Sequence, residues 1–240
     1  GLGAAPAPAL GASARFALPA RGLSPLTVAA PEDATTSNWS GYLLTDGPYT
    51  GVSGSFTVPR AAGGAPGPTV SEWVGVDGWG DDDLIQAGVD EVPEGSRHAL
   101  YEPWWEVLPG PQVLAPGVMV RPGDKVTVTL RQSAQGTWAI TLTDNSDDDS
   151  FSANEPYEGP LSSAEWVVEA NSSEDGTPTL LAPYQPEVAF SDLGASGAQS
   201  GLTSVTMVQS GAPVSTPSAL SAKGFDVAYG KMAPPAPVGP

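Results

Sequence analysis

The chain of 240 residues contains no cysteine and a single histidine, His98. The absence of cysteine excludes thiol nucleophiles, disulfide bonds and thiolate metal sites. A Ser-His-Asp hydrolase would have to use His98, which lies in an apparent hairpin loop, and no Gly-x-Ser-x-Gly elbow accompanies it. With one histidine, a zinc site would need three carboxylates, which is an uncommon ligand set. The familiar triad and zinc chemistries are therefore disfavoured.

Basic residues are also scarce, because nine Lys and Arg face 27 Asp and Glu, for a formal net charge of −18. A surface this negative repels phosphate backbones, so we expect no nucleic-acid partner. The acidity has two interpretations, a soluble acidic surface or a protein that works in acid. Carboxylates lose their charge near pKa values of about 3.9 for Asp and about 4.3 for Glu. Composition alone favours the first interpretation.

Long apolar runs and cofactor motifs are missing as well. No stretch of about 18 apolar residues occurs, so we expect no membrane-spanning segment and no membrane partner. Neither a Walker loop nor a Gly-x-Gly-x-x-Gly after a strand is present, so we expect no nucleotide cofactor. No basic segment with an apolar core opens the chain, and we expect any secretion signal to have been removed.

What the sequence does contain is a series of short alternating segments. Glycine (29) and proline (26) favour many strands joined by turns over long helices. Apolar residues alternate with polar ones in 125–131 and 137–143, and the same period of two recurs around 52–58, 188–190 and 225–229. No helix of ten or more residues is indicated. The pattern predicts an all-β, antiparallel sandwich or barrel.

The two ends differ from the middle. Residues 1–36 are rich in Ala, Pro and Gly without sustained periodicity, and we interpret them as an extended arm or the remnant of a pro-segment. Residues 37–232 form the predicted β-domain. Residues 233–240 form a Pro-rich tail that favours polyproline geometry and need not pack.

Two runs of aspartate, at 81–83 and 147–149, present hard oxygen ligands of the kind that bind Ca²⁺. Neither matches an EF-hand loop. We favour solvated charged turns over a metal site, and we expect no metal dependence.

Four segments together resemble the glutamic peptidases, or eqolisins, once grouped as pepstatin-insensitive acid proteases. They are Ser37–Tyr42 (SNWSGY), Ser71–Gly78 (SEWVGVDG) continuing into Leu84–Asp90 (LIQAGVD), Tyr101–Pro109 (YEPWWEVLP), and Ser163–Glu169 (SAEWVVE). They occur in the family's order, and the similarity covers about residues 37–230. The cysteines that fungal members usually carry are absent here.

The resemblance implies a two-sheet sandwich similar to the legume-lectin (concanavalin A-like) fold, with a concave substrate cleft. The family's catalytic Gln falls on Gln86 and its catalytic Glu on Glu165. The alternation agrees independently, because Gln86 shares a strand face with Gly88 and Asp90, while Ile85, Ala87 and Val89 oppose them. Glu165 and Glu169 likewise share a face opposite Trp166 and Val168.

Further candidates come from the same motifs. On the family's pattern Trp73 and Asp77 line the cleft near the pair, and the other substrate-binding candidates are Trp39, Asp90, Glu102, Trp105 and Glu106. Each has a structural alternative: the tryptophans suit a core, and the carboxylates and Gln86 suit an exposed strand.

The mechanism that the resemblance implies is attack on a peptide bond by a water that ionised Glu165 deprotonates, with the Gln86 amide donating to the oxyanion. It requires hydrogen-bond donors that keep Glu165 charged in acid. We expect a secreted endopeptidase acting on polypeptides, most active in acid, insensitive to pepstatin and metal-independent. Length and charge leave the oligomeric state open, with a monomer as the working expectation.

Two other functions suit the same fold class. A lectin-like carbohydrate-binding module would use the aromatic residues on sugars and hydrolyse nothing. A glycosidase would use paired carboxylates such as Glu102 and Glu106. A purely structural protein would tolerate changes at Gln86 and Glu165.

Overall fold

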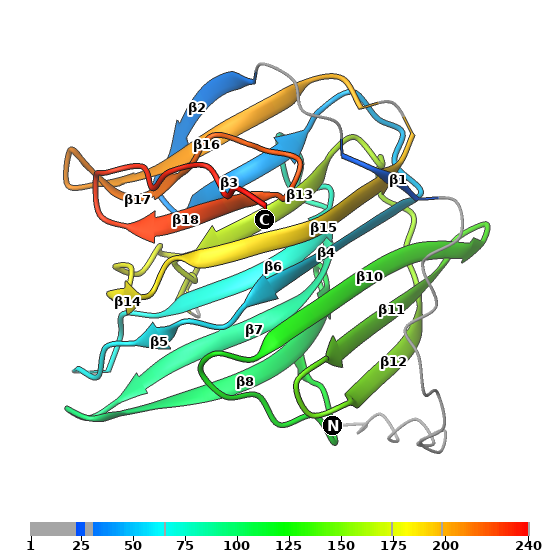
Figure 1. The fold of residues 1–240 in the computed structure, drawn as a ribbon. Coiled ribbons are helices and arrows are strands. Elements are labelled where there is room, and N and C mark those ends of the chain that lie inside the picture. The colour runs from blue at the N-terminus through cyan, green and yellow to red at the C-terminus, as the bar shows by residue number, and fades with distance from the viewer. Residues whose placement is uncertain (1–22, 27–30, 65, 174, 198, 240) are drawn as a thin grey trace.

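A computed structural model describes residues 23–26, 31–64, 66–173, 175–197 and 199–239. These residues form strands and loops with no α-helix, which confirms the all-β prediction (Figure 1). The strands are β1 (Ser24–Pro25), β2 (Glu32–Thr36), β3 (Trp39–Leu44), β4 (Gly51–Thr57), β5 (Arg60–Ala61), β6 (Val70–Val76), β7 (Ile85–Glu94), β8 (His98–Val107), β9 (Val113–Leu114), β10 (Lys125–Ala134), β11 (Thr137–Asp144), β12 (Asp149–Pro156), β13 (Ala164–Glu169), β14 (Tyr184–Gln185), β15 (Val188–Ser196), β16 (Leu202–Gln209), β17 (Ala212–Pro217) and β18 (Phe225–Tyr229). The described part of the chain holds no helix long and apolar enough to cross a membrane.

The strands form two layers that are continuous through their hydrogen bonds. The order runs β12-β11-β10-β4-β15-β18-β17-β16-β3-β13-β6-β7-β8-β9, and the small pair β14-β5 lies beside it. The neighbours are antiparallel, except that β2 runs parallel to β16. The layer of β4, β10 and β11 packs over β6 and β7, as Figure 1 shows. This is the predicted two-sheet sandwich, with β12 at one edge.

The main core lies between the layers and follows from the alternation. Ile85, Ala87 and Val89 of β7 and Trp166 and Val168 of β13 all lie in it, fully buried. Trp138 of β11 is also fully buried, edge-on to Tyr157 with ring centroids 5.9 Å apart. Because successive side chains of a strand point to opposite faces, the residues between these positions lie on the outer face of the β6–β7–β13 layer.

Both ends of the chain pack more than the sequence predicts. Residues 1–22 and 27–30 of the predicted arm lie outside the described residues. The remainder is not simply an extended arm, because β1 pairs with β15 and β2 pairs with β16. These short segments pair with β15 and β16 through backbone hydrogen-bonding groups. The alternation of side chains along a sequence does not predict such pairing. In the tail, the Pro237 carbonyl accepts a hydrogen bond of 2.6 Å from Ser221 Oγ.

Candidate active site

Glu165 and Gln86 share one row across the outer face of the sheet. Glu165 of β13 is paired with Gly75 of β6, and Gly75 is paired in turn with Gln86 of β7. Paired residues of antiparallel strands present their side chains on the same face. The two Cα atoms are therefore about 10 Å apart, twice the spacing of neighbouring strands. Since Gly75 has no side chain, a gap is left between the carboxyl and the amide, and the edge of the Trp73 indole lies in it.

Trp73 forms the floor beside this gap. Its indole leans along β6, so that a Cβ added at Gly75 would lie 2.7 Å from Trp73 Cζ3. On the neighbouring strand, a Cβ at Gly88 would lie 2.6 Å from Trp73 Cβ. The indole is held by a 2.7 Å hydrogen bond from its Nε1 to Glu169 Oε2, and it packs edge-on to Trp39. Gly75 and Gly88 leave room for the indole, and Glu169 holds its N–H, so these three residues fix the floor.

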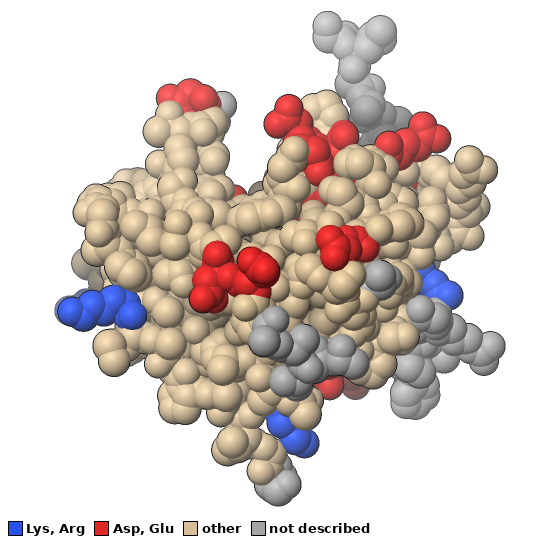
Figure 2. Space-filling model, turned by 90° about the horizontal axis from the view of Figure 1, so that it is seen from above, with Lys and Arg blue, Asp and Glu red and all other residues tan. Residues whose placement is uncertain are grey.

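Above this floor lies a cleft of about 1320 Å³. Its lining is strongly acidic and includes no Lys, Arg or His. The acidic lining residues are Asp81, Asp82, Asp83, Asp90, Glu106 and Glu169, and the large apolar ones include Trp39, Trp79, Leu84, Trp104 and Leu108. On the face of the molecule seen in Figure 2, acidic side chains border a hollow and the basic ones lie at the periphery. The cleft therefore suits an elongated ligand with apolar and cationic groups.

Glu165 lies beneath the surface of this cleft and is fully buried. Ser163 Oγ donates to its Oε1, while Oε2 has no hydrogen-bond partner among the described residues. Burial raises the pKa of Glu165 well above its ordinary value, the Ser163 hydrogen bond lowers it in part, and the charges of Asp77 and Asp81 raise it further. The expectation that several donors keep Glu165 charged in acid is therefore wrong for this geometry. It has one donor, and burial favours the protonated form.

Asp77 has a different place from the predicted one. It is fully buried and accepts hydrogen bonds from Tyr157 Oη at 2.5 Å, Leu161 N at 3.0 Å and Ser162 N at 2.6 Å. Its φ of 73° turns the chain sharply after β6. Because its oxygens are occupied by these donors, Asp77 does not line the cleft. It holds the loop that carries Ser163 towards Glu165.

Gln86 is oriented by a second carboxyl. Its Nε2 donates to Glu106 Oε1 at 2.8 Å, and the two residues are directly paired on β7 and β8. An amide nitrogen carries two hydrogens, so one N–H remains for a ligand. Burial and the charge of Asp90 raise the pKa of Glu106, while the Gln86 hydrogen bond lowers it. Asp90 in turn accepts from Gln112 Nε2 at 2.8 Å.

The remaining predicted site residues divide into three groups. Gln86, Trp39, Asp90 and Glu106 line the cleft, and Trp73 lies fully buried beneath it. Glu102 is on the same strand face but outside the cleft lining. Trp105 is on the opposite face, packed against the main core, so its prediction as a substrate contact is wrong. The alternation of β8 places Glu102, Trp104 and Glu106 together and Trp105 opposite.

The pairing of Glu102 with Glu106 that a glycosidase would need is not favoured. The two residues are four positions apart on β8, about 13 Å along the strand, with Trp104 between them. Glycosidase carboxyls are roughly 5 to 9.5 Å apart. Glu106 is also hydrogen-bonded to Gln86.

The two aspartate runs have distinct surroundings. Asp81 accepts from Gly78 N and Ser162 Oγ, which ties the loop after β6 to the loop before β13. Oxygens of Asp124, Asp144 and Asp147 lie within 4.8 Å of one another, and Arg121 forms a 2.6 Å ion pair with Asp147. The loops at 81–83 and 147–149 are mostly exposed at the surface, as solvated turns would be.

Sequence reasoning missed a second carboxyl pair, on the inner face. Glu72 of β6 and Glu91 of β7 are fully buried, and none of their four carboxyl oxygens has a hydrogen-bond partner among the described residues. They are diagonal neighbours, because Glu72 is paired with Val89 and Glu91 with Val70. Burial raises the pKa of Glu72 to about 8 and that of Glu91 well above its ordinary value. The sequence pattern could have indicated this. Glu72 occupies the same set of alternate positions as Val70, Val74 and Val76, so it is expected on the apolar face of the strand.

A substitution of Ser163 tests the immediate surroundings of Glu165. We expect Ser163→Ala to raise the pKa of Glu165, because Ser163 Oγ is its hydrogen-bond donor and stabilises the charged form. If Glu165 acts as a base, the acid limb of the kcat/KM profile will move to higher pH. Ser133→Ala serves as the control, because Ser133 is exposed on β10 away from Glu165, and an acid limb that moves equally in both would contradict the assignment.

Comparison with known proteins gives consistent results. Residues 37–229 match the Peptidase A4 family. The chain is 30% identical over 185 residues to Aspergillopepsin-2 of Aspergillus niger, which covers 66% of this chain and 61% of that protein. It is 27% identical over 175 residues to Scytalidopepsin B of Scytalidium lignicola, covering 69% and 65%. The chain thus spans less than two thirds of the length of each of these relatives.

Solved structures share the fold. A crystal structure of scytalido-glutamic peptidase with a transition-state analog inhibitor matches with a TM-score of 0.71 at 21% identity, over 80% of this chain and 98% of that chain. The crystal structure of aspergilloglutamic peptidase from Aspergillus niger matches with a TM-score of 0.58 at 24% identity, over 68% and 99%. At these identities the match establishes the architecture alone.

Proposed function

Because the chain belongs to the Peptidase A4 family, we propose that it is an acid endopeptidase in which Glu165 and Gln86 form the catalytic pair. The observation that carries the proposal is the row Glu165–Gly75–Gln86, which sets a carboxyl and an amide on one face of the sheet, two strands apart, with Gln86 in the lining of an open cleft. The relatives named as peptidases support a polypeptide substrate. We also propose that the protein is secreted.

The chemistry runs in two steps. The unpaired oxygen of ionised Glu165 accepts a proton from a water molecule, whose oxygen attacks the carbon of the scissile peptide. The free N–H of Gln86 donates to the oxygen that becomes negative. Glu165 then passes its proton to the leaving nitrogen, the C–N bond breaks, and the carboxylate is regenerated. Glu106 fixes the Gln86 amide through their hydrogen bond, from the β8 side of the strand, which is the side away from Glu165.

The buried state of Glu165 sets the pH dependence. The ionised fraction of a base falls below its pKa, and burial places that pKa above the ordinary Glu value of 4.5. Rising pH therefore increases activity on the acid limb. Glu169, whose pKa is raised to about 8, stays largely protonated up to neutrality. We expect a maximum in weak acid, where Glu165 is partly ionised and Glu169 is still neutral.

Digestion of an unfolded protein at a series of pH values, from about 2 to about 7, tests the proposal. We expect peptide release in acid, unaffected by pepstatin or by a chelator, and absent from Glu165→Ala. Release abolished by the chelator would contradict the mechanism. No release at any pH would favour the lectin-like alternative, after a test for an inhibitory segment at residues 1–36.

Gln86→Ala is expected to lower kcat by about 10²- to 10³-fold, the usual cost of one oxyanion donor, with a smaller change in KM. Gln135→Ala is the matched control, because Gln135 is exposed in the turn between β10 and β11. Steady-state kinetics on a peptide substrate measures both. A variant that changes KM alone would assign Gln86 to substrate binding instead.

A further inference from the structure

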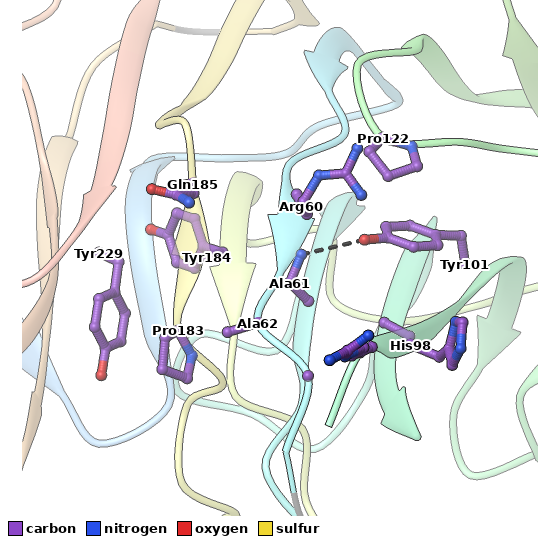
Figure 3. A pocket seen from close by; sticks show the side chains of 13 residues that line it. Arg60, Ala61, Ala62, His98, Tyr101, Pro122, Pro183, Tyr184, Gln185 and Tyr229 are labelled. Atoms are coloured by element: carbon purple, nitrogen blue, oxygen red, sulfur yellow. Dashed lines mark hydrogen bonds between the residues drawn. The ribbon is translucent and has the colours of Figure 1, made fainter. Parts of the chain in front are cut away.

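A second pocket of about 560 Å³ lies away from the cleft and shares no lining residue with it. It forms where the short pair β5–β14 meets the turn between β7 and β8, the loop before β10 and the end of β18. Figure 3 shows Tyr184 and Tyr229 on one side and Tyr101 and His98 on the other, with Ala61 and Ala62 between them. Its size is within the range of small-molecule sites.

The charge of this pocket is opposite to that of the rest of the molecule. Arg60, Arg97 and His98 line it, and its lining includes no Asp or Glu. These are three of the ten Lys, Arg and His residues in a chain of net charge −18. The ion pairs found in the described part of the chain involve Arg121 and Lys125, and neither pocket arginine belongs to one. Two guanidinium groups without protein counterions therefore face one cavity.

At low pH, the nearby carboxyl groups reduce the positive charge of the pocket only a little. Glu94 is paired with His98 across the β7–β8 hairpin, but it is exposed and lies outside the lining. The charges of Glu72 and Glu91 act on Tyr101 and Tyr184, which line the pocket. Both carboxyls are held neutral by burial below neutral pH. The two arginines then leave the pocket cationic.

The walls are aromatic and fixed. Tyr184 Oη bonds to Ser215 Oγ at 2.9 Å, and its ring packs edge-on to Tyr229 with centroids 5.8 Å apart. Tyr101 Oη accepts from Ala61 N at 3.2 Å, and Gly64 N donates to Gly95 O at 2.9 Å. These contacts join the β5 segment to the β7–β8 hairpin. A flat apolar group can lie between such rings without reorganising them.

We propose that this pocket binds a small organic oxyanion, a phosphate or sulfate monoester on a flat apolar body. Guanidinium groups match the oxygens of such esters with paired hydrogen bonds. A carboxylate ligand would lose its charge near pH 4, whereas a phosphate monoester keeps one negative charge there, because it regains only the second proton, whose pKa is about 6. The two arginines hold the oxyanion and the tyrosines contact the flat body.

Titration calorimetry with phenyl phosphate, at about pH 4 and low ionic strength, tests the proposal on the full chain. We expect one saturable site in the wild type and at least about tenfold weaker binding in Arg60→Gln/Arg97→Gln, because two charge-assisted hydrogen-bonding groups are lost. Arg131→Gln is the matched control, since Arg131 is exposed on β10 outside the pocket. Phenol and inorganic phosphate, which each lack one half of the ligand, should bind more weakly than phenyl phosphate.

Absence of saturable binding to the wild type would overturn the proposal, as would equal weakening in Arg131→Gln, which would indicate a general charge effect. Inorganic phosphate binding as tightly as phenyl phosphate would overturn the part assigned to the tyrosines. Peptidase activity should be the same in the double variant and the wild type, because the pocket and the cleft are separate.

Discussion

Glu165→Gln should reduce peptide release by at least about 10³-fold while leaving the fold intact. The variant removes the base, and Gln86 alone cannot take a proton from water, so the loss should be at least that of an oxyanion donor. The fold should tolerate the change because Glu165 is fully buried and favours its neutral form, which an amide of the same shape resembles. Ser163 Oγ can donate to the new amide oxygen as it does to the carboxyl.

Initial rates on an unfolded protein substrate, with circular dichroism of each variant, provide the measurement. Glu187→Gln is the matched control, since Glu187 is exposed between β14 and β15 and does not line the cleft. A folded Glu165→Gln protein that cleaves at the wild-type rate would remove Glu165 from the reaction. A loss that Glu187→Gln shares would point to net charge instead.

The free energy of unfolding should fall steeply as pH rises from acid to neutrality. Glu72 and Glu91 are buried together without hydrogen-bond partners, and the pKa of Glu72 is raised to about 8. A carboxyl with a raised pKa binds its proton more tightly in the folded than in the unfolded state. The contribution of such a carboxyl to the free energy of unfolding is therefore complete below about pH 4.5, and it is lost as pH rises towards about 8. Each unit by which the pKa is raised corresponds to about 1.4 kcal/mol of unfolding free energy. This amount is lost between the pH at which the carboxyl ionises in the unfolded chain and the pH at which it ionises in the core.

Thermal unfolding at pH 4 and pH 7 measures this effect, and Glu72→Gln should reduce the difference between the two midpoints by removing one of the two titrating groups. Glu94→Gln is the control, because Glu94 is on the same strand as Glu91 but exposed. Glu169, whose pKa is also raised to about 8, contributes to the fall in the wild type and in both variants. An unchanged midpoint difference in Glu72→Gln would exclude the pair as its source.

Alternation along the sequence predicts the fold well where one face of a strand is apolar. Segments 125–131 and 137–143 become β10 and β11, joined by a turn at Gln135 and Gly136. The placement of Gln86 and Glu165 opposite the core also follows from alternation. Their proximity does not, because it depends on β6 lying between β7 and β13. That requires β6 to pair with β13, about 90 residues away in the sequence, which only the family resemblance implies.

Other features are set by contacts that a linear pattern does not contain. Asp77 appears in the sequence as one more polar residue after a strand, and its role depends on donors from residues 157, 161 and 162. Trp105 follows Trp104 directly, and only the register of β8 decides which of the two faces the cleft. β1 and β2 form by backbone pairing with little side-chain burial.

The position of β12 at the end of the sheet affects how the protein behaves in concentrated solution. Within the described residues it pairs with β11 alone, which leaves one row of backbone groups available to another chain. Pro156 interrupts that row, and aspartates 147–149 give its other end charge that repels a second copy. Added salt screens this charge, so self-association into aggregates should start at this edge and should increase with ionic strength.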